Sequence, residues 1–393
     1  MKTTLDKTLF SIFYVLIFIS AIGRIQYSAT TVSLWINIYR LSVYLIILIG
    51  VIYVIYAHRI VHNKQINILA LMVFFELAVT LFSYSYFNIT LLNEAVIDLA
   101  AWPFVFILTY NFACNTEVPK SFKKITILGC AIIVGITGYN ISKMGSIGVN
   151  PAVGGVSYCV ALLPLIFMSF SRRNARIATA IILFIVMMST KRTSFLALLL
   201  GIFMYLISDA LIQEMPRKKF NKMIGLMSLV VIAVIVGIYM IEQSDLEIIR
   251  EFASGDETMS GRTLLWNRIL AYFDNQDSVR KFLGNGMHAV KYKINPYGLG
   301  WFAHNSFIET LYDYGVVGLI ILVSFLVLII KKCIEINKRK SKVAPIISYT
   351  IPPMLLFAFA SYFFEIGQSI LLYSFVWSFC LALYDNGREL EIV

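Results

Sequence analysis

The sequence predicts an all-α polytopic membrane protein, and three observations support this fold class. Of the 393 residues, 59% are hydrophobic and only 14% are charged, a composition that a soluble domain cannot bury in one core. Apolar runs of about 17–25 residues, long enough to cross the hydrocarbon layer as helices, recur along the chain. Lys and Arg concentrate in the short stretches between these runs. We therefore expect about twelve transmembrane helices and one large extracytoplasmic loop that contains short helices.

The expected helices follow the apolar runs in order. The first run comes after a basic start, and because no small-residue cleavage motif follows it, we expect a retained membrane helix rather than a cleaved signal. The expected spans are 8–23, 34–56, 66–84, 95–113, 123–141, 152–170, 175–190, 193–213, 222–241, 304–330, 344–363 and 367–384.

The distribution of Lys and Arg predicts the orientation of these spans, because flanks that remain in the cytoplasm are enriched in both. With the N-terminus in the cytoplasm, 21 of the 33 basic residues fall on that side, 5 in the short outer segments and 7 in the long loop. We therefore expect both termini in the cytoplasm. The net charge of +11 is then explained by membrane orientation, and we expect no nucleic-acid partner.

Residues 242–303 form the one long connection, and the charge distribution places them outside the cytoplasm. They separate an N-terminal bundle of about nine helices (1–241) from about three C-terminal helices (304–393). A loop of this length in a compact protein is usually functional. Within it, Ser260 is a suitable N-cap for "GRTLLWNRILAYF", so we expect a short helix on the membrane surface. The apolar residues at helical spacing are Leu264, Leu265, Ile269 and Tyr272.

The cysteines carry no sign of a metal site or a disulfide framework. All five fall in apolar segments or basic loops, with neither metal-ligand nor disulfide spacing. We expect free thiols and no bound metal. The five are Cys114, Cys130, Cys159, Cys333 and Cys380.

Polar chemistry gathers where the long loop re-enters the membrane, in "HNSFIETLYDYGVVGLI". His304 begins the expected helix, Asn305 or Ser306 can cap it, and the i, i+4 pair Glu309 and Asp313 shares one face. A histidine at a lipid–water boundary can be no more than an interfacial polar group. Because this one closes the long loop, we favour a functional role.

Three arginines are further candidates. Arg192, after Lys191 in "STKRTSF", stands between two apolar runs on the outer side, where a buried guanidinium is costly and is usually paired or faces a cavity. Alternatively, both side chains extend to the lipid head groups. Arg262 starts the expected surface helix, where backbone N–H groups favour an anion. Arg268 lies on the same helix, either as a second contact to substrate or as a solvated charge.

These stretches resemble the O-antigen polymerase and O-antigen ligase superfamily, bacterial membrane glycosyltransferases with a GT-C-type fold. Three segments carry the resemblance: "KRTSF" between the outer ends of two helices, "SGRTLLWNRIL" followed by "FLGNGMH" in the long loop, and "HNSFIETLYDYGVVGLI". The last is the most specific, with its His-Asn start, Asp313 two residues before Gly315, and Gly318 three further on.

The resemblance implies a lipid-diphosphate-linked glycan as donor, usually on undecaprenyl diphosphate, with no further cofactor and with transfer on the outer face of the bacterial cytoplasmic membrane. It also implies a glycan acceptor, membrane lipid, and a flippase and chain-length regulator as partners. Planar guanidinium groups suit the diphosphate, and an imidazole, with an ordinary pKa of about 6.5, suits the base that takes the acceptor proton. The catalytic candidates are His304, Arg262 and Arg192, and the candidate substrate contacts are Lys191, Asn305, Glu309, Asp313 and Arg268.

Three alternatives remain open at the level of sequence. A ligase differs from a polymerase in its acceptor, a lipid A core instead of a second repeat unit; the Ile-, Lys- and Asn-rich composition favours the polymerase, because it also suits organisms without lipopolysaccharide. A lipid-linked sugar transporter is expected to place charges at the midplane of repeated halves, and Glu76 has no counterpart in the second half. If the protein is a scaffold for other assembly enzymes, alanine substitution of all three catalytic candidates is expected to leave polymer length unchanged.

Overall fold

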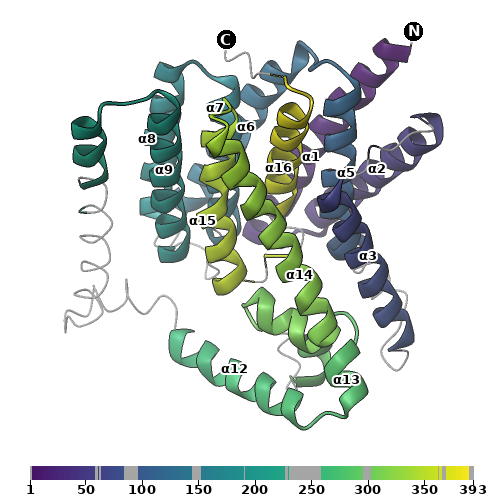
Figure 1. Ribbon diagram of the computed structural model, residues 1–393. Coiled ribbons are helices and arrows are strands. Elements are labelled where there is room, and N and C mark those ends of the chain that lie inside the picture. The colour runs from purple at the N-terminus through teal and green to yellow at the C-terminus, as the bar shows by residue number, and fades with distance from the viewer. Residues whose placement is uncertain are drawn as a thin grey trace.

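The computed structural model describes residues 2–57, 61, 63–83, 96–143, 152–189, 191–225, 229, 258–294, 302–361, 363–364 and 369–388. Within these residues the regular structure is entirely helical, and most of the long helices run side by side as a bundle (Figure 1). The helices are α1 (Lys2–Thr30), α2 (Ser33–Ala57), α3 (Lys64–Phe82), α5 (Ala101–Asn115), α6 (Ser121–Ser142), α7 (Ala152–Ser169), α8 (Arg172–Met188), α9 (Arg192–Ile212), α12 (Thr258–Asp274), α13 (Ser278–Leu283), α14 (Ser306–Lys338), α15 (Ala344–Ala360) and α16 (Ile370–Asp385), with the short π-helical turns η2 (Val96–Ala100) and η3 (Val290–Ile294).

The helices follow the apolar runs of the sequence. Every expected span except 222–241 coincides with a helix to within a few residues at most ends; of that range the structure describes only 222–225, which are helical, and residue 229. Seven of the described helices are long and apolar enough to cross a membrane, and three shorter apolar helices accompany them. The chain is therefore a multi-pass, all-helical membrane protein. The number of spans, about twelve, and the extent of the long loop stay predictions.

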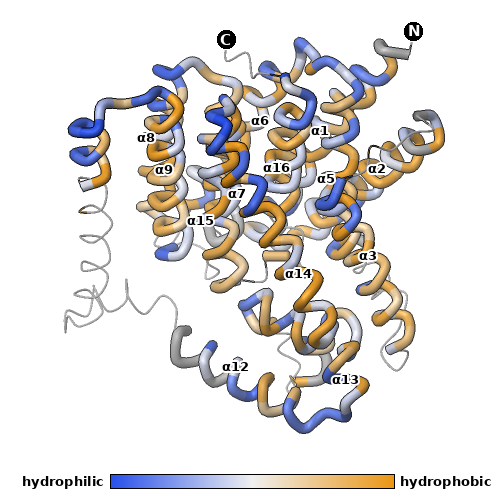
Figure 2. Tube along the Cα trace, in the orientation of Figure 1, coloured by the Kyte–Doolittle hydropathy of each residue, from blue (hydrophilic) through white to orange (hydrophobic). Residues whose placement is uncertain are grey.

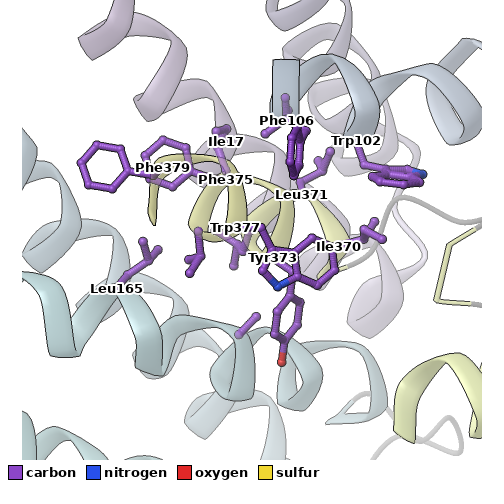
Figure 3. Packing of buried hydrophobic residues seen from close by; sticks show 14 of the residues in the cluster. Ile17, Trp102, Phe106, Leu165, Ile370, Leu371, Tyr373, Phe375, Trp377 and Phe379 are labelled. Carbon is purple, nitrogen blue, oxygen red and sulfur yellow. The ribbon is translucent and has the colours of Figure 1, made fainter. Parts of the chain in front are cut away.

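The core is centred on α16. Its residues from Ile370 to Leu383 are all buried, and it contacts α5, α7 and α15. Figure 3 shows α16 side chains with Trp102 and Phe106 of α5 and Leu165 of α7. The Trp377 indole N–H donates to the Thr350 hydroxyl oxygen at 2.8 Å, which satisfies a polar group that lipid cannot. The same cluster includes side chains from the first helix to the last, so the N-terminal and C-terminal bundles share one core.

Polar contacts join both ends of the chain to one face of the bundle. Lys7 forms a salt bridge of 2.7 Å with Glu117, and the Arg388 guanidinium donates to the carbonyl oxygens of Ala113 and Thr116. Both ends of the chain accordingly lie at the same end of the molecule in Figure 1, and this face carries hydrophilic connecting segments in Figure 2. The charge distribution predicts the same side for all of these residues, so the observed pairing agrees with the predicted alternation.

Helices α12 and α13 lie at the opposite end of the molecule (Figure 1). They pack against α14, which runs from this end to the face that carries the termini. The C-terminal end of α15 also reaches this level, because α15 descends from the face of the termini. The segments that carry the candidate residues therefore converge at one end of the bundle.

Candidate functional site at the end of the bundle

Helix α14 begins at Ser306, directly after the His-Asn pair. The Asn305 side-chain oxygen accepts hydrogen bonds from the N–H groups of Phe307 (3.0 Å) and Ile308 (3.2 Å), so Asn305 is the N-cap. The expectation that His304 begins the helix is wrong, because Asn305 is the N-cap and the first helical residue is Ser306, two positions after His304. His304 instead adopts a left-handed backbone, with a φ of +52°.

Two helices hold the residue that precedes His304. The Trp266 indole N–H, from α12, donates to the Ala303 carbonyl oxygen at 2.6 Å. The Ala303 N–H donates to a carboxylate oxygen of Glu309 on α14. Ala303 and Glu309 are both fully buried. Side chains from both helices thus bind the peptide groups immediately before the histidine.

Helix α12 differs in two ways from the expected surface helix. It begins at Thr258, so Ser260 lies inside it and is not the N-cap, and Arg262 lies one turn along rather than at the start. The helical hydrogen bonding extends further toward the N-terminus than the Ser260 cap predicts. Arg262 donates from Nη1 to the Ala360 carbonyl oxygen at 3.1 Å, at the C-terminal end of α15, where carbonyl groups lack helical partners.

The apolar face of α12 packs against the loop and α14. Ile269 is 1% exposed, and Leu265 and Trp266 are partly buried beside it. The expected apolar face is confirmed for Leu265 and Ile269, but wrong for Tyr272, which is 45% exposed. The side chain of Leu264 lies outside the described residues. A helix with one buried face and one exposed face lies along the end of the bundle.

Arg262 and His304 are brought together by two bridges. Arg262 and Trp266 are four residues apart on α12 and therefore share a face, and Trp266 bonds to the residue before His304. Ser306, two residues after His304, donates its hydroxyl to the Ser361 carbonyl oxygen at 3.3 Å, next to the Ala360 carbonyl that Arg262 binds. The residues on either side of His304 are thus linked to α12 and to the end of α15, which Arg262 also contacts.

Arg192 reaches the same end of the bundle from α9. It is the first residue of that helix, with Lys191 at the N-cap position, and both are half-buried. Helices α9 and α15 pack closely, because a Cβ added to Gly201 would lie 2.7 Å from the Tyr349 ring. The two helices run in opposite directions (Figure 1). Arg192, nine residues before Gly201, therefore lies at about the same height in the bundle as Ala358, nine residues after Tyr349. Arg192 is thus level with the C-terminal end of α15.

Asp313, a candidate substrate contact, is fully buried and binds the long loop. Its carbonyl oxygen accepts from the N–H groups of Asn285 (2.9 Å) and Gly286 (2.8 Å), and its carboxylate accepts from the N–H of Val290 (3.1 Å). The Asn285 amide donates to the carbonyl oxygen of Tyr312 at 2.8 Å. These contacts fasten the "GNG" turn to α14.

Arg268 is the candidate that the structure does not bring to the others. It is exposed, and its guanidinium lies 5.9 Å from the Tyr272 ring centroid. Two helical residues correspond to a rotation of about 200°, so Arg268 lies on the face of α12 opposite Trp266. The solvated alternative is the one that this position favours.

Two buried acidic or basic groups extend the polar network. Glu76 is buried on α3, which packs against α14, the helix that carries Asp313. His288 is 2% exposed, with its Nε2 atom 3.9 Å from an Asp98 carboxylate oxygen and its ring edge-on to Phe302. Among the described residues, no three His, Cys, Asp or Glu side chains are grouped to hold a metal ion, and the five cysteines are free thiols.

Sequence reasoning missed Trp266, Asn285 and His288. Trp266 had one signal, a large aromatic residue four positions after a candidate arginine. Asn285 and His288 lie in "GNGMH", where two glycines with positive φ, Gly284 and Gly286, form a tight turn that the glycine spacing can suggest. The partners of all three are distant in sequence, so no local pattern identifies their contacts.

Comparison with known proteins identifies the segment that contains this site. Residues 177–323 match the family model described as O-antigen ligase, a range that contains Lys191, Arg192, Arg262, His304 and Asp313. A search of curated proteins gives no match. The match agrees with the resemblance carried by the three sequence motifs, and over residues 177–323 the chain is similar to the O-antigen polymerase and ligase superfamily.

Proposed function

We propose that this protein is a polysaccharide polymerase that transfers a lipid-diphosphate-linked glycan to a sugar hydroxyl of a second lipid-linked repeat unit. The family match supports O-antigen polymerase or ligase activity in general, and with it lipid-linked glycan substrates at a membrane. The observation that supports the proposal is that Arg262 and Trp266, on one face of α12, bond to the C-terminal end of α15 and to the residue before His304. A phosphate-binding group and a proton acceptor are thereby offered to one substrate.

The reaction is a single displacement. The acceptor hydroxyl oxygen attacks the anomeric carbon of the donor glycan, and the bond from that carbon to the diphosphate oxygen breaks. The electron pair leaves with the lipid diphosphate, and His304 takes the proton of the hydroxyl group. One displacement inverts the anomeric centre.

Arg262 and Arg192 stabilise the leaving group. A diphosphate gains negative charge as it departs, and the planar, permanently charged guanidinium groups bind phosphate oxygens in pairs, so no metal ion is required. One Arg262 nitrogen donates to the Ala360 carbonyl, and a guanidinium has five N–H donors in all. We prefer Arg192 to Lys191 because an ammonium group lacks this planar geometry.

The location follows from the same chemistry. Transfer on the outer face of the bacterial cytoplasmic membrane places the site at the end of the bundle opposite the two termini, which then lie in the cytoplasm. A flippase that delivers the lipid-linked repeat and a regulator of chain length are the partners that such a reaction needs. A ligase would use the same residues with a lipid A core as acceptor.

Purified protein in proteoliposomes tests the proposal. The assay supplies lipid-diphosphate-linked repeat units alone, or with a lipid A core acceptor, and separates the glycans by length. A polymerase produces a ladder of lengthened chains from the repeats alone. Product found only on the lipid A core would assign ligase activity instead, and flux of the repeat across the bilayer without any change in length would assign transport.

A further inference from the structure

The residue before His304 is buried, and side chains from two helices form hydrogen bonds with its backbone N–H and carbonyl groups. Ala303 is fully buried, its carbonyl oxygen accepts the Trp266 indole N–H at 2.6 Å, and its N–H donates to Glu309. Neither bond caps α14, because Asn305 already provides the N-cap. Trp266 and Glu309 come from different helices and meet on one residue.

His304 itself has a backbone conformation that needs support. A φ of +52° lies in the left-handed region, which is unfavourable for a residue with a side chain. Such conformations persist when neighbouring contacts fix the chain, and they concentrate at functional sites. The two bonds to Ala303 restrain the segment that leads into this conformation, and Asn305 restrains the segment that follows it.

Glu309 is an unfavourable choice for a purely structural contact. It is 0% exposed, one carboxylate oxygen accepts the Ala303 N–H, and the other, Oε1, has no hydrogen-bond partner among the residues that the structure describes. Burial of an incompletely bonded carboxyl group lowers stability. Its hydrogen bond to the residue before the histidine accounts for its presence better than packing does.

We infer that Trp266 and Glu309 are positioning residues, which hold the Ala303 peptide so that the His304 imidazole faces the acceptor hydroxyl. The inference rests on the proposed function, because it takes His304 as the proton acceptor. Trp266 carries a second consequence: it links Arg262, one turn earlier on α12, to the histidine. Helix α12 thereby fixes the distance between Arg262, the proposed phosphate ligand, and His304, the proposed base.

Trp266→Phe is the primary test, with Trp377→Phe as its matched control. Phenylalanine keeps an aromatic ring beside Phe359, whose ring centroid lies 5.8 Å from that of Trp266, but removes the indole N–H. Trp377 likewise donates its indole N–H, to Thr350, in the bundle core. We expect Trp266→Phe to lower kcat roughly 10- to 100-fold with KM for the lipid-linked repeat within about twofold, because small misplacements of a reacting group have large effects on rate. Trp377→Phe lowers the thermal midpoint and leaves kcat per folded protein unchanged.

Glu309→Gln and Glu309→Leu test the second bond. Glutamine keeps an oxygen that accepts the Ala303 N–H, so we expect activity close to that of the native protein, whereas leucine lowers kcat as Trp266→Phe does. A Trp266→Phe protein with native kcat would overturn the inference, as would equal losses in the Gln and Leu variants. If His304→Ala retains transfer, the proposed function fails; if His304→Ala is inactive while Trp266→Phe is unaffected, only the inference fails.

Discussion

Gly315 and Gly284 lie with their backbones in direct contact. A Cβ added to Gly315 would lie 2.7 Å from the Gly284 nitrogen and 2.4 Å from the Phe282 carbonyl oxygen, and one added to Gly284 would lie 2.4 Å from the Tyr314 Cα. Both glycines have positive φ, +66° and +90°, and α14 kinks at Gly315. The contact seats the long loop on α14 next to Asp313. Two glycines far apart in sequence thus fix one junction.

Gly315→Ala is expected to destabilise the protein by about 2–4 kcal/mol, because it combines a left-handed backbone with backbone overlap. The thermal unfolding midpoint in detergent measures the effect, and glycan transfer is expected to fall with it as the loop loosens. Gly135→Ala is the matched control, since nothing lies within 4 Å of a Cβ added there. Equal midpoints for the two variants would show that the junction does not need glycine.

Asn305 is expected to act through the helix start rather than through substrate. Asn305→Ala removes both cap hydrogen bonds and should cost about 1 kcal/mol, whereas Asn305→Asp retains an accepting oxygen and should preserve stability. We expect the KM for the lipid-linked repeat to stay near the native value in both. A stable Asn305→Asp protein with a strongly raised KM would assign the side chain to substrate binding instead.

Much of the fold could be predicted from the sequence, because a helix that crosses lipid must be apolar along its whole length. The start of α14 near residue 304 was predictable from where the apolar run begins. The shared face of Glu309 and Asp313 followed from their i, i+4 spacing, and the Asn305 cap followed from residue type. The position of Arg262 inside α12 and the left-handed backbone of His304 were not. Both depend on contacts with Ala360, Trp266 and Glu309, which no local pattern encodes.

Substituting Lys191 and Arg192 one at a time shows which of the two side chains binds the diphosphate. Arg192→Ala is expected to reduce transfer by at least 100-fold, because a guanidinium that binds a departing diphosphate acts mainly in the transition state. Lys191→Ala is expected to keep transfer within a few-fold of native. Turnover of a defined lipid-linked repeat measures both, and the opposite pattern would make Lys191 the phosphate ligand.

The orientation of the bundle is open to cysteine labelling. Cys114 is the least buried native thiol, so Cys114→Ser gives a low background. Asp274→Cys, at the end of α12, should react with a membrane-impermeant thiol reagent in intact cells, while Lys338→Cys, at the far end of α14, should react only after the membrane is opened. Labelling of Lys338→Cys in intact cells would place the termini outside the cytoplasm.

The length of glycan made by purified His304→Ala, Arg262→Ala and Arg268→Ala proteins tests the central claim most directly, namely that a base and a phosphate ligand converge at the start of α14. Arg268 is the control, because it shares α12 with Arg262 but lies on the opposite, exposed face. The account predicts that the first two proteins leave the lipid-linked repeat unextended while Arg268→Ala still makes long chains. Long chains from folded His304→Ala protein would contradict it.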